Sequence, residues 1–200
     1  MSIGKKALRQ ECYRRRSALT AAQRAASATA LLRAVQSLSA GSTPGVGRVA
    51  AYASTGLEPG TAPLLTALEG VLLPVLEPDG DLDWALFEGE LVEGARGTLQ
   101  PPGPRLGRDA VADVALVVVP ALAVDRSGTR LGRGGGSYDR ALARTSAYVV
   151  AALHEGELHV SLPVEPHDRP VGGAVLADRG LVRLRPHPLD GLGATPGGGS

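Results

Sequence analysis

The chain has 200 residues, which is the length of one or two domains, and no central polar linker divides it. Its 21 basic and 20 acidic residues give a formal charge of +1. This balance lacks the positive excess of proteins that bind phosphate backbones, so we expect no nucleic-acid partner. Hydrophobic residues make up 44% of the chain but aromatic residues only 3%, so Leu, Val and Ala must fill the core.

The N-terminal segment is charged from Lys5 to Arg16, and no apolar run follows it. The sequence therefore predicts neither a signal peptide nor a membrane span, and we expect no membrane partner. Cys12 is the single cysteine of the chain, so an intrachain disulfide and a cysteine-ligated zinc site are excluded. We expect a cytoplasmic protein that is a monomer.

The first part of the chain has the pattern of two helices. Residues 3–19 lack proline and carry strong helix formers, which predicts a first helix. Thr20 followed by Gln23 matches a capping box, and the alanine-rich run from there to Leu38 predicts a second helix. Glycine and proline in residues 41–47 end it.

The rest of the chain alternates strands with helices. Short apolar runs at residues 49–53, 71–76 and 114–119 are typical of parallel strands buried on both faces. Polar and apolar residues alternate over residues 81–87, which predicts an edge strand with one wet face. Further expected elements are helices at 61–68 and 138–144 and strands at 148–153 and 173–184.

This order of elements predicts an α/β fold. We expect a single three-layer domain over residues 1–188, Rossmann-like, with a mainly parallel central sheet flanked by helices. Residues 189–200 are Gly, Pro and Ser-rich and have nothing to bury, so they are predicted to be a disordered tail.

Four glycines stand directly before the helix expected at residues 138–144: Gly132, Gly134, Gly135 and Gly136. Such a run lets backbone N–H groups converge on one point, and a helix start adds positive partial charge there. Arg130 and Arg133 flank the loop with guanidinium groups that can neutralise phosphate oxygens. The loop matches neither a Walker A loop nor the Rossmann fingerprint, and glycines alone are equally compatible with a tight turn. With its two arginines, the loop predicts a phosphate site.

Three more charged residues fit a nucleotide site. Asp139, at the expected helix start, offers a carboxylate to a hard cation such as Mg²⁺, although the helix dipole alone also favours an Asp there. Lys5 and Arg9 are four residues apart, so a helix places both on one face, where they repel unless an anion lies between them. A solvated basic face is the alternative. Lys5 and Lys6 are the only lysines in the chain, which favours the functional interpretation.

The most specific pattern spans residues 120–139. It reads Pro-Ala-Leu-Ala-Val-Asp from Pro120 and Arg-Leu-Gly-Arg-Gly-Gly-Gly-Ser-Tyr-Asp from Arg130. This segment resembles the signature of the 5-formyltetrahydrofolate cyclo-ligase (methenyltetrahydrofolate synthetase) family, Pro-(Gly)-Leu-Ala-Phe-Asp and Arg-Leu-Gly-x-Gly-x-Gly-Tyr-Tyr-Asp. The chain departs from this signature at two positions. Val124 replaces an aromatic residue, and Ser137 replaces the first of two tyrosines.

Two other segments are similar to family patterns. Glu58 lies in a loop three residues before Thr61, as in the family's substrate segment, and a carboxylate can accept two parallel hydrogen bonds from a pterin. Residues 162–168 resemble a late family segment whose Asp helps to bind magnesium, which implies that role for Asp168. Gln100 departs from the pattern, because a Glu is common there.

The resemblance implies that ATP, with Mg²⁺, drives the cyclisation of 5-formyltetrahydrofolate to 5,10-methenyltetrahydrofolate. The implied ATP-binding residues are Lys5, Lys6, Arg9, Arg130, Leu131, Gly132, Arg133, Gly134, Gly135, Gly136, Ser137 and Tyr138. The implied folate-binding residues are Ala53, Glu58, Arg133, Gly134, Gly135, Gly136 and Ser137. The implied magnesium ligands are Asp139 and Asp168, and the implied catalytic residues are Lys5, Arg130 and Arg133.

Two alternatives stay open. Fold alone does not determine the substrate, so another ATP-dependent kinase or ligase on the same scaffold is the first. The second is a non-catalytic nucleotide-binding module that has lost turnover. The departures at Val124, Ser137 and Gln100 are the features that favour it.

Overall fold

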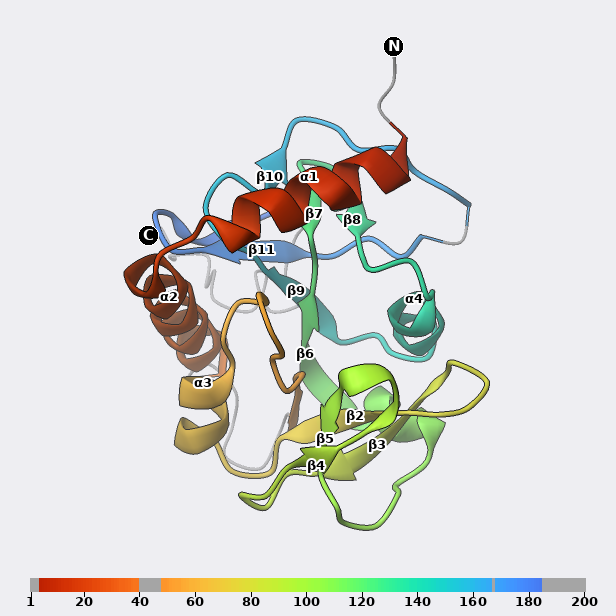
Figure 1. The fold of residues 1–200 in the computed structure, drawn as a ribbon. Coiled ribbons are helices and arrows are strands. Elements are labelled where there is room, and N and C mark those ends of the chain that lie inside the picture. The colour runs from red at the N-terminus through yellow and green to blue at the C-terminus, as the bar shows by residue number, and fades with distance from the viewer. Residues whose placement is uncertain (1–3, 40–47, 167, 185–200) are drawn as a thin grey trace, which may run out of the picture.

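The computed structural model describes residues 4–39, 48–166 and 168–184. Its main feature is a seven-stranded sheet with the strand order β12-β11-β9-β6-β1-β2-β3 (Figure 1). The strands are β1 (Arg48–Ala50), β2 (Leu72–Leu76), β3 (Leu82–Leu86), β6 (Val114–Pro120), β9 (Tyr148–Ala152), β11 (Gly173–Leu176) and β12 (Gly180–Arg183). The five inner strands pair in parallel, and β3 and β12 are antiparallel at the two edges. The expected mainly parallel sheet is confirmed.

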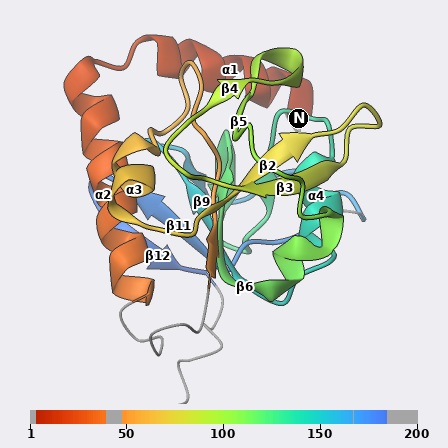
Figure 2. The same ribbon diagram turned by 90° about the horizontal axis from the view of Figure 1, so that it is seen from below.

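Helices cover both faces of this sheet. The α-helices are α1 (Lys5–Ser17), α2 (Ala21–Ser39), α3 (Ala62–Ala67) and α4 (Ser137–Leu142), and the 3-10 helices are η1 (Ala95–Gly97) and η2 (Arg108–Asp113). Figure 2 shows α2 and α3 on one side of the sheet and α4 on the other. None of the helices in the described part of the chain has the length and apolar character that crossing a membrane requires.

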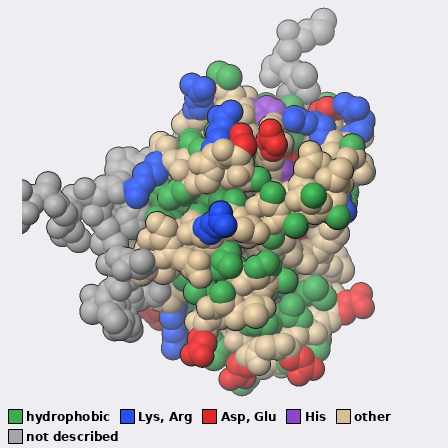
Figure 3. All heavy atoms as spheres, turned by 90° about the vertical axis from the view of Figure 1, so that its left-hand side faces the viewer, with side chains coloured by type: hydrophobic (Ala, Val, Ile, Leu, Met, Phe, Trp, Pro, Cys, Tyr) green, Lys and Arg blue, Asp and Glu red, His purple; other side chains and the backbone are tan. Residues whose placement is uncertain are grey.

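The central strand β6 packs against both helical layers. Leu116 and Val118 pack with the residues of α2 and α3, whereas Val117 and Val119 pack with those of α4 and η2. Successive side chains of a strand point to opposite faces, so burial on both sides requires the continuous apolar run seen in the sequence. The three-layer prediction is confirmed. On the outer face of the α2–α3 layer, basic and acidic side chains both occur among hydrophobic ones (Figure 3).

The capping box at the start of α2 is present. The Gln23 backbone N–H donates to Thr20 Oγ1 at 3.2 Å, and the Thr20 backbone N–H donates to Gln23 Oε1 at 2.9 Å. These two bonds satisfy backbone donors that a helix start leaves unpaired. The predicted last strand, residues 173–184, is a hairpin of β11 and β12 with Gly180 at a φ of 63°.

One detail of the strand predictions is wrong. The strand predicted at residues 81–87 lies at the sheet edge as expected, but it has no wet face. Ala85 is buried, and Asp83 is half-buried and accepts a hydrogen bond from the Gly107 backbone at 2.8 Å. The chain after β5 runs along β3, where the Leu106 backbone N–H donates to the Trp84 carbonyl at 2.8 Å.

Five short strands were not predicted. A three-stranded sheet has the order β10-β7-β8, and a separate hairpin joins β4 to β5. Their bounds are β4 (Val92–Glu93), β5 (Leu99–Gln100), β7 (Ala123–Asp125), β8 (Arg130–Leu131) and β10 (Leu158–His159). Strands of two or three residues are too short to show a periodicity. Helix α1 lies across the three-stranded sheet (Figure 1) and packs Leu8 and Cys12 on it. The predicted tail, 189–200, and the domain limit at 188 lie outside the described residues.

Candidate active site

A cavity of about 380 Å³ lies between α1, the glycine loop, the loop after β1 and the β2–β5 region. This volume is within the range of small-molecule sites. Its charged lining comprises Lys5, Arg9, Arg16, Arg96, Arg130, Arg133, Glu58, Asp139, Glu165 and Asp168. Six of these are basic and four acidic, so the lining carries an excess of two positive charges, which favours an anionic ligand.

All the predicted site residues except Lys6 line this cavity. Lys5 and Arg9 face it from α1, as their spacing of four predicts. Lys6 is exposed instead, because consecutive helical residues point about 100° apart. The structure therefore does not support a place for Lys6 in the site.

Two cations of helix α1, Lys5 and Arg9, bind other segments at the cavity. Lys5 Nζ lies 2.8 Å from Asp168 Oδ2 and 3.1 Å from Glu165 Oε2. Partial burial opposes the ammonium charge, but the hydrogen bonds to these carboxylates outweigh it and raise the pKa of Lys5. Arg9 Nε donates to the Gly132 carbonyl at 2.9 Å, which holds α1 to the glycine loop.

Gly132 and Gly134 let two arginines approach the loop closely, and Gly134 also has a backbone angle that favours glycine. Gly134 has a φ of 103°, and a Cβ there would lie 3.2 Å from Arg9 Cζ. A Cβ on Gly132 would lie 2.8 Å from Arg130 Nη1. Larger residues would push both arginines away from the loop. The loop is also anchored from outside, since Ser137 Oγ donates to the Gly80 carbonyl at 2.5 Å.

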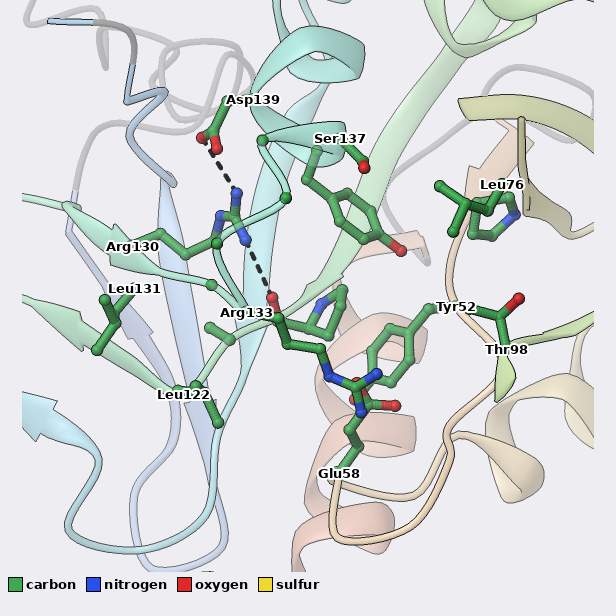
Figure 4. Close-up of a pocket in the computed structure, with 18 of the residues that line it drawn as sticks. Tyr52, Glu58, Leu76, Thr98, Leu122, Arg130, Leu131, Arg133, Ser137 and Asp139 are labelled. Atoms are coloured by element: carbon green, nitrogen blue, oxygen red, sulfur yellow. Dashed lines mark hydrogen bonds and ion pairs between the residues drawn. The ribbon is translucent and has the colours of Figure 1, made fainter. Parts of the chain in front are cut away.

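Arg130 is the most buried cation of the glycine-loop segment, with 4% of its side chain exposed. It lies 3.1 Å from Asp139 Oδ1 and stacks 5.6 Å from the centre of the Tyr138 ring (Figure 4). Its Nη1 donates to the Pro120 carbonyl at 3.3 Å. Its buried Nε has no hydrogen-bond partner among the described residues. Buried donors rarely stay unpaired in native proteins, so a ligand acceptor beside Arg130 would satisfy this group.

Glu58 is a preformed acceptor at the far side of the cavity. Its Oε2 accepts the Thr55 backbone N–H at 2.9 Å, and its Oε1 lies 3.2 Å from Arg133 Nη2. Only 9% of the Glu58 side chain is exposed, against 51% for Arg133. Figure 4 shows the two side chains together beside Tyr52. The carboxylate is thus held in place, while its arginine partner has room to move.

The loop that carries Glu58 is held by bonds to its backbone. The Tyr52 hydroxyl donates to the Pro59 carbonyl at 2.7 Å, and Thr61 exchanges bonds with Ser54 at 3.0 and 3.1 Å. Burial, above all, raises the pKa of the Tyr52 phenol well above its usual value, so this group stays a donor.

Two features of the site have no signal in the sequence. One is the ion pair of Arg16 with Glu157, at 2.7 Å, in which both side chains are 3% exposed. These residues are 141 positions apart, so no local pattern could reveal the pair. The other is the apolar wall formed by Pro74, Leu76, Leu82 and Leu99. In Figure 4, Leu76 and Thr98 lie across the cavity from Arg130 and Leu131.

Known proteins are similar to this chain in sequence. The model of the 5-formyltetrahydrofolate cyclo-ligase family matches residues 1–177. A 5-formyltetrahydrofolate cyclo-ligase of Mycolicibacterium smegmatis is 43% identical over 149 residues, which are 68% of this chain and 77% of the relative. That of Escherichia coli K12 is 35% identical over 141 residues, 64% of this chain and 76% of the relative.

Solved structures show the same architecture. The NMR structure of Aquifex aeolicus 5,10-methenyltetrahydrofolate synthetase matches with a TM-score of 0.75 and 28% identity, over 91% of this chain and 93% of that one. A Mycoplasma pneumoniae 5,10-methenyltetrahydrofolate synthetase matches in fold, with a TM-score of 0.63 and 18% identity over 84% and 96% of the two chains. With a family model that spans most of its length and a relative at 43% identity, this chain belongs to the 5-formyltetrahydrofolate cyclo-ligase family.

Proposed function

We propose that this chain uses ATP to cyclise 5-formyltetrahydrofolate to 5,10-methenyltetrahydrofolate, releasing ADP and phosphate. The observation that carries the proposal is a single cavity in which the glycine loop and its cations meet the preformed carboxylate of Glu58. Membership of the cyclo-ligase family supports the same reaction.

The chemical difficulty lies in the formyl oxygen, which is a poor leaving group. In the proposed reaction this oxygen attacks the γ-phosphorus of ATP, and the bond to ADP breaks. The folate N10 then attacks the formyl carbon and loses its proton, and the C–O bond breaks to release phosphate. The protein mainly positions the two substrates and neutralises charge, as in other phosphoryl transfers.

The triphosphate would lie against the glycine loop and α1. Lys5, Arg9, Arg130 and Arg133 would neutralise it, and the loop N–H groups would donate to its oxygens. The unpaired Nε of Arg130 fits this role because it lacks an acceptor among the described residues. Desolvation raises the pKa of Tyr138, which favours a neutral ring stacked on Arg130 over a proton acceptor.

Magnesium fits the carboxylates at the same end of the cavity. Asp139 uses Oδ1 for Arg130 and for the Arg169 backbone, while its Oδ2 has no hydrogen-bond partner within the described ranges. We propose that Asp139 and Asp168 hold the ion, since Mg²⁺ usually takes one or two carboxylates and completes its shell with water and phosphate oxygens. When bound, it would neutralise charge on the β- and γ-phosphates.

The first test is a spectrophotometric assay of methenyltetrahydrofolate formation from 5-formyltetrahydrofolate, ATP and Mg²⁺. We expect Lys5→Ala to lower kcat by about 100-fold or more, as losing a preorganised charge at a transition state typically does. Lys6→Ala is the matched control, because Lys6 is adjacent in sequence but exposed. It should keep the wild-type rate. An equal kcat for these two variants would refute the assignment of Lys5 to the site.

The rival functions predict different binding. Isothermal titration that shows ATP binding without folate binding would favour another kinase or ligase. Tight binding of both ligands without turnover would favour a non-catalytic module. We also propose that the protein is a cytoplasmic monomer. A light-scattering mass near 20.4 kDa would support the monomer.

A further inference from the structure

Arg96 has an unusual backbone conformation. It is the only non-glycine residue with a positive φ in the part of the chain that the structure describes, at φ 56° and ψ 32°. It lies at the tip of the tight β4–β5 hairpin, which is closed by the Gly94 backbone N–H donating to the Thr98 carbonyl at 2.8 Å. Gly or Asn adopts this left-handed conformation more readily than Arg. Strain retained next to a cavity is a reason to look for a function of the residue.

Arg96 also differs from the other cations of the cavity in its partners. Lys5, Arg16, Arg130 and Arg133 each pair with a carboxylate, and Arg9 donates to a carbonyl. The Arg96 side chain makes no hydrogen bond or ion pair with any described residue, although it lines the same cavity. Arg96 is exposed, and its guanidinium contributes positive charge that no described group of the protein compensates.

The surroundings of Arg96 indicate which part of a ligand it would meet. It lines the cavity together with Thr98 and Leu99 of the same hairpin and the apolar residues Pro74, Leu76 and Leu82. Leu76 and Thr98 of this wall lie across the cavity from Arg130 and Leu131, where the triphosphate is proposed to bind (Figure 4). The wall thus offers an apolar surface with a single cation, which suits a flat ring followed by a carboxylate.

We propose that Arg96 binds the glutamate tail of the folate. Beyond its pterin, the substrate carries a benzoyl ring and then a glutamate with two carboxylates. The ring would lie on the wall of Leu76, Leu82 and Leu99, and the planar guanidinium would donate hydrogen bonds to a carboxylate of the tail. This inference rests on the proposed function, because that function supplies the ligand. It makes Arg96 a specificity-determining residue that takes no part in the chemical step.

The test compares two substrates, 5-formyltetrahydrofolate and the neutral methylamide of 5-formyltetrahydropteroate, here called the pteroate, which has neither the glutamate nor a free carboxylate on the benzoyl ring. Arg96→Asn removes the cation and keeps a residue that tolerates a positive φ, so the hairpin should fold. We expect it to raise the KM for the folate about 10-fold, the usual effect of losing one charged hydrogen-bonded contact, with kcat and the KM for ATP unchanged. With the pteroate, wild type and Arg96→Asn should have the same KM.

Two further variants sharpen the result. Arg96→Lys keeps the charge without the fork and should raise the folate KM less than Arg96→Asn does. Arg33→Gln is the matched control, since Arg33 is exposed on α2 and outside the cavity lining. It should match wild type with both substrates. Thermal melting of each variant verifies the fold.

The outcomes separate the inference from the proposed function. If Arg96→Asn has the wild-type folate KM, or raises the KM for folate and pteroate equally, Arg96 does not bind the tail and the inference is overturned while the function stands. If it raises the KM for ATP instead, the guanidinium belongs to the nucleotide site and the inference is again wrong. A wild-type protein that turns over neither substrate contradicts the proposed function and, with it, this inference.

Discussion

At the scale of single residues, three of the ion pairs in the cavity lining are Lys5 with Asp168, Arg130 with Asp139, and Arg133 with Glu58. Each joins a cation proposed for phosphate to a carboxylate proposed for another ligand. A ligand that binds to one of these side chains must therefore replace its ion-pair partner. A phosphate that takes Arg133 would free Glu58 for the pterin, which would couple the binding of the two substrates.

Glu58→Gln tests the pterin contact. Gln keeps one acceptor oxygen but loses the charge and the second acceptor, and a hydrogen bond to a charged group contributes about 1.5–3 kcal/mol. We expect the folate Kd, measured by isothermal titration, to rise about 10- to 100-fold. Glu69→Gln is the control, since Glu69 is exposed and outside the cavity lining. An unchanged folate Kd in Glu58→Gln would refute this assignment.

At the scale of elements, one buried network connects α1, α2, the turn after β9 and the Glu58 loop. Glu157 pairs with Arg16 of α1 and accepts the His154 backbone N–H at 2.8 Å. His154 Nδ1 lies 2.9 Å from Ser27 Oγ of α2, and its Nε2 lies 3.2 Å from the Leu57 carbonyl. Leu57, the residue next to Glu58, is thus held by His154, which is almost 100 positions away in the chain. Helix α1, which carries Lys5, is held by Glu157 of the same turn.

Glu157→Gln should be strongly destabilising. Arg16 and Glu157 are each 3% exposed at the side chain, and removing one partner leaves a buried charge without compensation, which typically costs about 3–5 kcal/mol. Urea unfolding followed by circular dichroism measures the change. The double variant Arg16→Met with Glu157→Gln should lose less than the sum of the two single variants, because no buried charge remains. Additive losses would show that the pair is not coupled.

His154 makes stability depend on pH in a defined window. A carbonyl only accepts, so Nε2 donates to Leu57 and Nδ1 accepts from Ser27, which is a neutral imidazole. Burial, the largest cause, lowers the pKa of His154 below its ordinary 6.5, against the pull of Glu157. The unfolded chain therefore binds the proton first, and stability falls as the pH falls from about 6.5 toward the lower folded pKa.

The measurement is urea unfolding of wild type and His154→Gln between pH 7.5 and about 5. Wild type should lose up to about 1.4 kcal/mol more per pH unit than the variant below pH 6.5. The other histidines are common to both proteins, so their contributions cancel in the comparison. Parallel pH profiles for the two proteins would show that His154 does not titrate differently on folding.

At the scale of the whole molecule, the cavity lies beside β1 and β6, where the strand order of the parallel sheet reverses. The chain leaves β1 toward β2 through α3, whereas it leaves the neighbouring β6 toward β9, past α4 on the opposite face. The segments after these two strands diverge, and Tyr52 and Ala53 from one and Ala121 and Leu122 from the other line the gap. Ligands of open α/β sheets bind at such switch points. The sheet topology therefore positions the site before any side chain does.

The long elements and the residues of the glycine loop could be predicted from the sequence alone. These features depend on local patterns: continuous apolar runs, the Thr20–Gln23 capping box and the four-residue spacing of Lys5 and Arg9. The structure contains each of them, because a local pattern depends only on residues close together in the chain. Three outcomes became visible only in the folded chain: Lys6 lies outside the cavity, Arg16 pairs with Glu157, and Arg96 reaches the lining without a partner among the described residues. Those outcomes depend on contacts between segments far apart in the chain, and no spacing along the chain encodes which distant group a side chain will meet.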